Sequence, residues 1–160
     1  MIRTVVKLED FSKELENWNN ASLKKKRDAV TNGLLRSIPD LVEASPVDTG
    51  LYAQSWQVEM KEDRGIIGNT APYAGEIEQG TRPFTPPIGP LLAWAKRKLS
   101  GELGSAGTGQ PETDYSPEVW ALAKKVQNLI TERGMLPKHV MENTIPKIIE
   151  NIKEEMRRSA

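Results

Sequence analysis

The spacing of apolar residues changes along this 160-residue chain, and that change constrains its fold more than any other feature. Over residues 10–44 and 116–160, apolar side chains recur at every third or fourth position, which is the spacing of a helix with one buried face. Residues 55–60 instead alternate polar and apolar side chains, as a half-buried strand does. The sequence therefore predicts an α+β fold, with a small antiparallel β-sheet packed against a long N-terminal helix and C-terminal helices.

The predicted N-terminal helix covers residues 10–44 and ends before Pro46. Pro39 lacks a backbone N–H and clashes with the preceding turn, so a kink or a restart is expected near Ser37. The apolar stripe of this segment consists of Phe11, Leu15, Trp18, Val30, Leu34, Ile38 and Leu41.

The middle of the chain predicts an antiparallel hairpin. A turn-like sequence at 62–65 separates the alternating residues 55–60 from a short apolar return strand at 65–69. Residues 1–8 also alternate and could add an edge strand. Because a lone hairpin is marginal in water, the sheet is expected to pack on the N-terminal helix.

The second half of the chain predicts helices separated by extended segments. Four prolines make residues 82–90 an extended arm, a short helix is expected at 91–99, and residues 100–114 have the Gly- and Ser-rich composition of a flexible loop. All 160 residues are predicted to form a single domain: the N-terminal helix (10–44), a corner and β-hairpin core (45–81), the arm and loop (82–115) and the C-terminal helices (116–160).

Local capping signals define the C-terminal helices. Ser116 and Pro117 form a helix start, and Gly134 comes after the last turn of that helix. The final helix is expected to open at Pro137 or Thr144, with an apolar stripe at Met141, Ile145, Ile148, Ile149, Ile152 and Met156.

Composition excludes several classes of site. The chain has no cysteine, so thiol nucleophiles, disulfides and cysteine metal sites are excluded, and one histidine excludes any site that needs two imidazoles. The 22 basic and 22 acidic residues balance, which argues against a dedicated nucleic-acid binder. No apolar run matches a membrane helix or a signal-peptide core. We predict no catalytic residues, no cofactor and no metal.

Three weak candidate sites favour structural interpretations. Glu76 and Glu78 could form an acid–base pair, but hydrogen bonding to a turn or a subunit contact is the better interpretation. The glycines at 104–109 lack the lysine of a phosphate loop. His139 has no expected partner for metal or triad chemistry and is predicted to be a surface or capping residue.

A basic run could contact DNA, although such runs are usually solvated faces. Only four residues contribute to it, and no aromatic residue flanks it closely. The run consists of Lys24, Lys25, Lys26 and Arg27. It supports an alternative of another class, a small nucleic-acid-binding protein.

The corner at 45–50, Ser-Pro-Val-Asp-Thr-Gly, is the most constrained segment of the chain. Pro46 fixes one dihedral angle and forces Ser45 out of the helical region. Asp48 or Thr49 can cap a turn after it, and Gly50 permits a positive φ. By itself the pattern indicates a tight helix-to-strand corner.

Together with residues 51–81, the corner resembles the HK97 gp10-like family of tailed-phage proteins. The ordered set is a long helix, residues 45–51, a serine before a strand, Ile67-Gly68, Ala-Pro-Tyr-Ala at 71–74, then Glu78 and Gly80-Thr81. Residues 134–137, Gly-Met-Leu-Pro, are similar to a later element of the family. Glu76, Gln79 and a long insertion at 85–113 depart from the pattern. The matching residues are Pro46, Asp48, Thr49, Gly50, Ser55, Gly68, Pro72, Tyr73, Glu78, Gly80 and Thr81.

The resemblance implies a structural protein of the virion neck, a tail-completion component made in the host bacterial cytoplasm. Such proteins are thought to form a ring of copies, commonly sixfold, between head and tail. The implied partners are head–tail connector or adaptor proteins and tail terminator or tail tube proteins, with packaged DNA close by and no membrane. The nearest alternative is a tail terminator or head-closure protein. Possible partner contacts are Arg82, Pro83, Phe84 and Trp94.

The net charge of zero is a sum of unlike parts. Residues 1–44 carry 8 basic and 7 acidic side chains, residues 45–80 carry 2 and 6, and residues 81–160 carry 12 and 9. A subunit whose faces differ in sign would suit head-to-tail contacts between protein partners.

Overall fold

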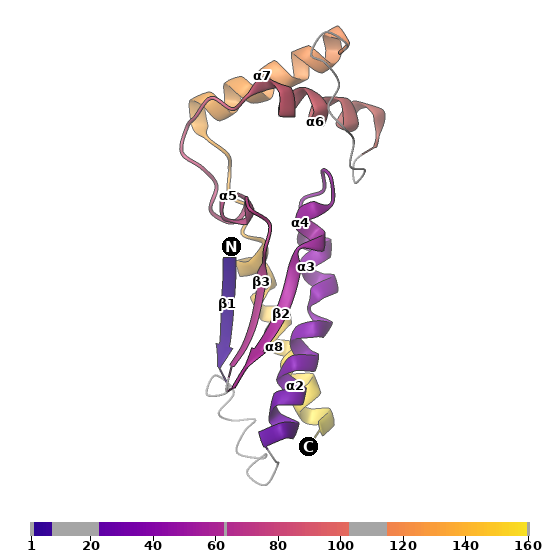
Figure 1. The fold of residues 1–160 in the computed structure, drawn as a ribbon, viewed down its shortest axis with the longest axis vertical. Coiled ribbons are helices and arrows are strands. Elements are labelled where there is room, and N and C mark those ends of the chain that lie inside the picture. Colours follow the sequence, from indigo (N-terminus) through magenta and orange to yellow (C-terminus); the bar gives the residue numbers. More distant parts are fainter. Residues whose placement is uncertain (1, 8–22, 63, 103–114, 160) are drawn as a thin grey trace.

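A computed structural model of the chain describes residues 2–7, 23–62, 64–102 and 115–159 (Figure 1). The predicted α+β class is confirmed: a small antiparallel sheet packs against helices, and a pair of helices stands beyond one end of it. Along the chain the elements are β1 (Ile2–Lys7), α2 (Leu23–Arg36), α3 (Ile38–Ala44), α4 (Leu51–Gln54), β2 (Trp56–Lys61), β3 (Arg64–Asn69), α5 (Ala74–Gln79), α6 (Ile88–Ser100), α7 (Pro117–Arg133) and α8 (Val140–Ser159).

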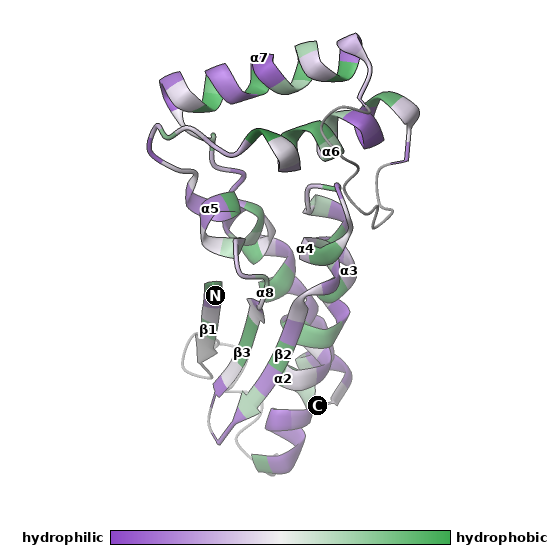
Figure 2. Ribbon diagram, turned by 45° about the horizontal axis from the view of Figure 1, so that its top comes forward, coloured by the Kyte–Doolittle hydropathy of each residue, from purple (hydrophilic) through white to green (hydrophobic). Residues whose placement is uncertain are grey.

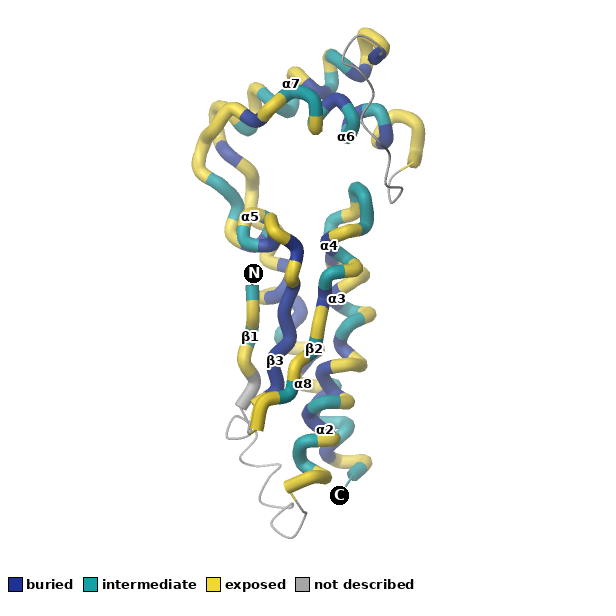
Figure 3. The backbone as a smooth tube through the Cα atoms, in the orientation of Figure 1, coloured by how far each residue is buried: buried dark blue, intermediate teal, exposed yellow. Residues whose placement is uncertain are grey.

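The sheet has the strand order β1-β3-β2, with both pairs antiparallel. The predicted hairpin and the predicted N-terminal edge strand are therefore confirmed. β3 lies in the centre and is buried at every residue after the first (Figure 3). In register, Trp56 lies opposite Asn69 and Val58 opposite Ile67, so these residues share the face that packs on the helices.

The single long helix predicted for residues 10–44 is not supported. Residues 23–44 form two helices, α2 and α3, and residues 10–22 of the predicted helix lie outside the described residues. The break falls at Ser37, where Pro39 predicted it. There the Ser37 amide donates to the Leu34 carbonyl oxygen at 3.0 Å, and the Ser37 hydroxyl donates to the Gly33 carbonyl oxygen at 2.8 Å.

Close contact between α2 and α8 forms the main core. The two helices run antiparallel, and a Cβ on Gly33 would lie 2.5 Å from the Cα of Ile152. On the other side of α2, a Cβ on Gly65 of β3 would overlap the side chain of Leu34. Glycine at these two positions lets the helix approach both the strand and α8. The buried residues of this core include Val30, Leu34, Leu41, Ile67, Ile148, Ile152 and Met156.

Helices α6 and α7 form a hairpin with a small apolar cluster of its own. Its buried members are Leu92, Ala95, Tyr115, Val119 and Ala123. Apolar residues gather in the first part of α6 (Figure 2). The arm predicted at 82–90 ends sooner than expected, since α6 begins at Ile88 and includes Pro90. A first-turn proline leaves no intrahelical hydrogen bond unmade.

The C-terminal helices begin and end close to their predicted limits. Ser116 Oγ accepts a hydrogen bond from the Val119 amide, and α7 ends at Arg133, directly before Gly134, as the capping signals indicated. The last helix opens at Val140, which corrects the expected start at Pro137 or Thr144. None of the helices in the described ranges is both long and apolar enough to cross a membrane.

The α2–α8 contact gives a test of the core. Replacing Gly33 with alanine should lower the free energy of unfolding by about 1–3 kcal/mol, because the α8 backbone must move aside. Gly75 is the control, since a Cβ there meets nothing within 4 Å and alanine should be neutral or stabilise α5 by about 0.5–1 kcal/mol. Urea unfolding measures both, and equal stabilities for the two variants would contradict the packing described.

Candidate interaction site

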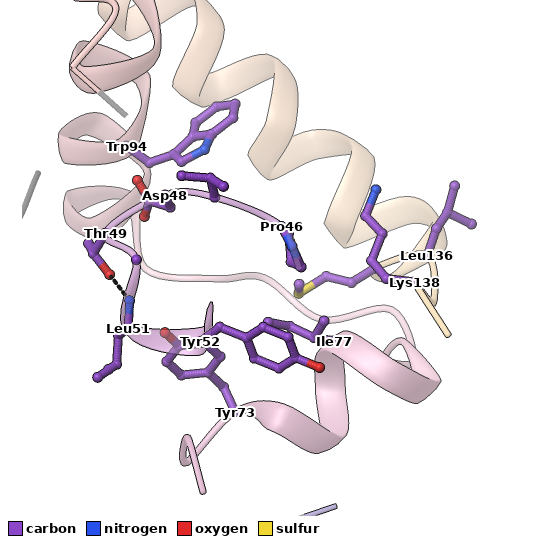
Figure 4. Close-up of a pocket in the computed structure, with 13 residues that line it drawn as sticks. Pro46, Asp48, Thr49, Leu51, Tyr52, Tyr73, Ile77, Trp94, Leu136 and Lys138 are labelled. Atoms are coloured by element: carbon purple, nitrogen blue, oxygen red, sulfur yellow. Dashed lines mark hydrogen bonds between the residues drawn. The ribbon is translucent and has the colours of Figure 1, made fainter. Parts of the chain in front are cut away.

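An apolar groove lies between the α6–α7 hairpin and the end of the sheet (Figure 4). Its volume is about 260 Å³. Trp94 of α6 lies on one side, and Tyr52, Tyr73 and Ile77 lie on the other. The remaining lining residues come from the corner and from the segment before α8: Pro46, Val47, Asp48, Thr49, Gly50, Leu51, Met135, Leu136 and Lys138. We call this space the groove.

The rim of the groove exposes large apolar side chains. Leu136 is 79% exposed and Val47 54%, and Leu51, Tyr73 and Met135 are also exposed. Single exposed apolar residues are ordinary on a protein surface, but their concentration around a concave site is typical of an interaction surface.

A bidentate ion pair joins the hairpin to the corner at one end of the groove. Arg97 Nε and a terminal nitrogen of Arg97 each lie 2.8 Å from an Asp48 carboxylate oxygen. The hydrogen bond to Asp48 raises the pKa of the Arg97 guanidinium above its ordinary value. The corner itself turns at Gly50, whose φ of 81° is one that glycine adopts without strain.

At the other end, two chain segments leave the body side by side. The Thr81 amide donates to the Met135 carbonyl oxygen, and the Met135 amide donates to Thr81 Oγ1, both at 3.0 Å. Gly80 and Gly134 both have positive φ, and a Cβ on either would strike the backbone of the opposite segment. We call this crossing the joint.

A buried carboxylate lies behind the groove. Glu78 Oε1 accepts hydrogen bonds from the Tyr52 hydroxyl and from the Met141 amide, each at 2.9 Å. Because the Met141 amide is in the first turn of α8, Glu78 caps that helix from a distant part of the chain. Burial and the hydrogen bond to Glu78 raise the pKa of the Tyr52 hydroxyl well above its ordinary value.

Asn69 extends this network to the sheet. Its side-chain nitrogen donates to the Tyr52 carbonyl oxygen at 2.7 Å, and its side-chain oxygen accepts from the Ala71 amide at 2.9 Å. On the other side of Tyr52, the Trp56 ring makes an edge-to-face contact at 5.6 Å, and its Nε1 donates to Ser45 Oγ at 3.0 Å. The corner, β2, β3, α5 and α8 are therefore linked.

The structure brings most of the predicted motif residues close together. Ser55 Oγ donates to the Leu51 carbonyl oxygen at 2.6 Å, and Thr49 Oγ1 accepts from the Leu51 amide. Gly68 lies elsewhere, on β3, where a Cβ would lie 2.7 Å from the Ile2 carbonyl oxygen. Pro72 is exposed beside the groove-lining Tyr73.

The four predicted partner contacts lie in two different places. Trp94 lines the groove and is half-buried, with Lys98 Nζ 5.6 Å from its ring centroid. Arg82, Pro83 and Phe84 are exposed on the segment that leads to α6.

The basic run is separate from the groove. Lys24 and Arg27 lie at the start of α2, at the opposite end of the molecule, beside a hollow that Met60 also lines. Lys25 and Lys26 belong to the same turn of α2. DNA contact there stays a prediction.

The weak candidate sites of the sequence, Glu76 with Glu78 and His139, have contacts that suit structural roles. Glu76 is exposed, whereas Glu78 is buried in hydrogen bonds to Tyr52 and the α8 backbone. His139 lies immediately before α8, with its Nδ1 3.0 Å from a Glu142 carboxylate oxygen, so the surface or capping prediction is confirmed. The glycines at 104–109 lie outside the described residues. No cluster of three potential metal ligands occurs among the residues that the structure describes.

Sequence reasoning missed Tyr52, Asn69 and Arg97. Arg97 stands between Lys96 and Lys98 in the basic last part of α6, so nothing in the sequence set it apart from its neighbours or indicated Asp48 as its partner. Asn69 closes an apolar strand, and the hydrogen-bonding capacity of its amide was the only hint of its role.

Comparison of the chain with protein-family models, with curated proteins and with solved structures finds no significant match.

The Tyr52–Glu78 hydrogen bond predicts a pH dependence of stability. Tyr52→Phe should lower the free energy of unfolding by about 1–3 kcal/mol at neutral pH. Because folding raises the pKa of Tyr52, this contribution is complete below the unfolded value of about 10 and is lost as pH rises above it.

Denaturant unfolding from about pH 7 to about pH 11 measures this difference. The gap between wild type and Tyr52→Phe should be constant up to about pH 9 and shrink above about pH 10. Tyr73→Phe, on the exposed rim, is the control and should show no gap. A gap that widens with pH would contradict the assignment.

The Asp48–Arg97 pair predicts a local effect on the hairpin. Asp48→Ala should make the α6 amides exchange hydrogen about two- to tenfold faster, because it removes a tie between α6 and the body. The α2 and α8 amides should be unaffected. Asp40→Ala, which breaks a pair with Lys147 on α8, is the control and should leave α6 unchanged. Equal effects on all helices would disprove a local role.

Proposed function

We propose that the protein is a structural virion component of a tailed bacteriophage, a tail-completion or neck subunit that joins the tail to the head connector as part of a ring. The observation that carries this proposal is the convergence of two distant motif segments, 45–51 and 71–81, on one groove. The same two segments carry the resemblance to the HK97 gp10-like family.

The hydrogen bonding of these segments favours an architectural role. Glu78 is directed to Tyr52 and to the α8 backbone, and Asp48 is directed to Arg97. The polar groups therefore fix the shape of the corner. The surface that remains for a partner is apolar, and apolar side chains in concave sites are the usual anchors of protein–protein contacts.

The shape of the molecule also favours assembly into a ring. The body is elongated, with the α6–α7 hairpin at one end and the start of α2 at the other (Figure 1). A closed ring needs two different complementary surfaces on each subunit, because its contacts are heterologous. In the proposed particle the ring lies at the neck, meets connector and tail proteins on its two sides, and surrounds the DNA channel.

Deletion of the gene from the phage tests the proposal. The deletion lysate should contain filled heads and finished tails that fail to join, as seen by electron microscopy. Supplying the wild-type chain from a plasmid should restore joined particles, and this is the control. Joined, infectious particles from the deletion alone would refute the proposed function.

A further inference from the structure

We propose that the groove binds residues 11–18 of a second copy of this chain, so that neighbouring subunits are linked through a donor segment and an acceptor groove. This inference rests on the proposed ring, because it names the contact between its copies. We call residues 8–22 the donor segment.

The groove suits an apolar segment with acidic neighbours. Its lining is mostly apolar, and Asp48, an acid in that lining, is held by Arg97. Two cations accompany the lining: Lys138 is exposed at one end, and Lys98 lies over the ring of Trp94. An occupant of negative charge is therefore favoured over a basic one.

The donor segment has the matching chemistry. Phe11, Leu15 and Trp18 have the spacing i, i+4, i+7, so on a helix they would share one face. Amphipathic helices dock into apolar grooves through anchors at this spacing. The segment also carries four acids, against Lys13 as its one base: Glu9, Asp10, Glu14 and Glu16.

Chain length prevents the donor segment from reaching the groove of its own subunit. The segment joins α2 at Leu23, and α2 and α3 extend end to end toward the groove (Figure 1). At 1.5 Å per residue these helices span about 30 Å. The roughly five residue steps from Trp18 to Leu23 cover at most about 18 Å when fully extended. The donor must therefore come from another copy.

This geometry makes the contact heterologous. The donor segment joins the described chain at Lys7 and Leu23, at the end of the subunit opposite the groove, so one copy can bind the next without using up its own groove. Such contacts close into a ring when the rotation between neighbours permits it.

The test uses a full-length chain whose own donor is disabled by Phe11→Ser, Leu15→Ser and Trp18→Ser. A fluorescent peptide of residues 8–22 is titrated with this chain, and its anisotropy is measured. Saturable binding is expected, and a scrambled peptide should not bind.

Groove variants of the same chain locate the binding. Val47→Ser with Leu136→Ser should weaken binding at least about tenfold, since both side chains are anchors exposed on the rim. Leu99→Ser with Leu129→Ser removes two other exposed apolar residues, both on the hairpin, and is the control. All four positions are exposed, so folding should be preserved, which circular dichroism checks.

Charge reversal provides a second, independent readout. Lys138→Glu should weaken binding about two- to fivefold at low salt and less at high salt, whereas Lys61→Glu, distant from the groove, should leave it unchanged.

Three results would overturn the inference. They are no saturable binding up to about 1 mM chain, equal binding by the groove variant, and a wild-type chain that excludes the peptide while it is monomeric, which would mean that the donor occupies its own groove. None of them alters the deletion phenotype, so the proposed function would stand if this contact failed.

Discussion

The carboxylate of Glu78 joins three parts of the chain at the end of the body that carries the groove. It lies at the end of α5, it accepts from Tyr52 of α4, the helix that follows the corner, and it accepts from the first turn of α8. A buried carboxylate without partners would be costly, so the corner and α8 must be placed where their donors reach it. This arrangement fixes the side of the groove that carries Tyr52 and Ile77, whereas Trp94 of α6 forms the opposite side.

The body and the α6–α7 hairpin pack their apolar side chains differently. In the body, glycines at 33 and 65 bring α2 against α8 and β3, so the core is dense and continuous. In the hairpin, two helices enclose only a small cluster, and Trp94 and Trp120 remain partly exposed beside it. Two helices alone cannot cover such large side chains. The hairpin consequently keeps apolar surface directed toward the groove, and there a partner would bury it.

Signals within short stretches of sequence predicted most helices and strands, whereas the site depends on contacts between residues that are far apart in the sequence. The Ser116-Pro117 start, the stop at Gly134 and the alternation at 55–60 act within a few residues, and the helix and strand form where these signals lie. The Asp48–Arg97 pair and the Glu78–Met141 bond join residues 49 and 63 positions apart. No periodicity encodes such pairs, because they depend on how the elements pack. The start of α6 was misplaced for a local reason: prolines favour an extended chain, yet a first turn tolerates one.

The joint has a consequence for how this molecule can change. The chain leaves the body at Thr81 and returns at Met135, and these two residues are hydrogen-bonded neighbours. A segment whose ends already meet can be lengthened, shortened or exchanged with little effect on the rest, since closing it costs the body nothing new. The hairpin is thus an insertion into the body, and a replacement that keeps the groove must also supply a partner for Asp48 and a side chain in place of Trp94. Lineages of this protein could diversify that insertion without redesigning the sheet and helices that support it.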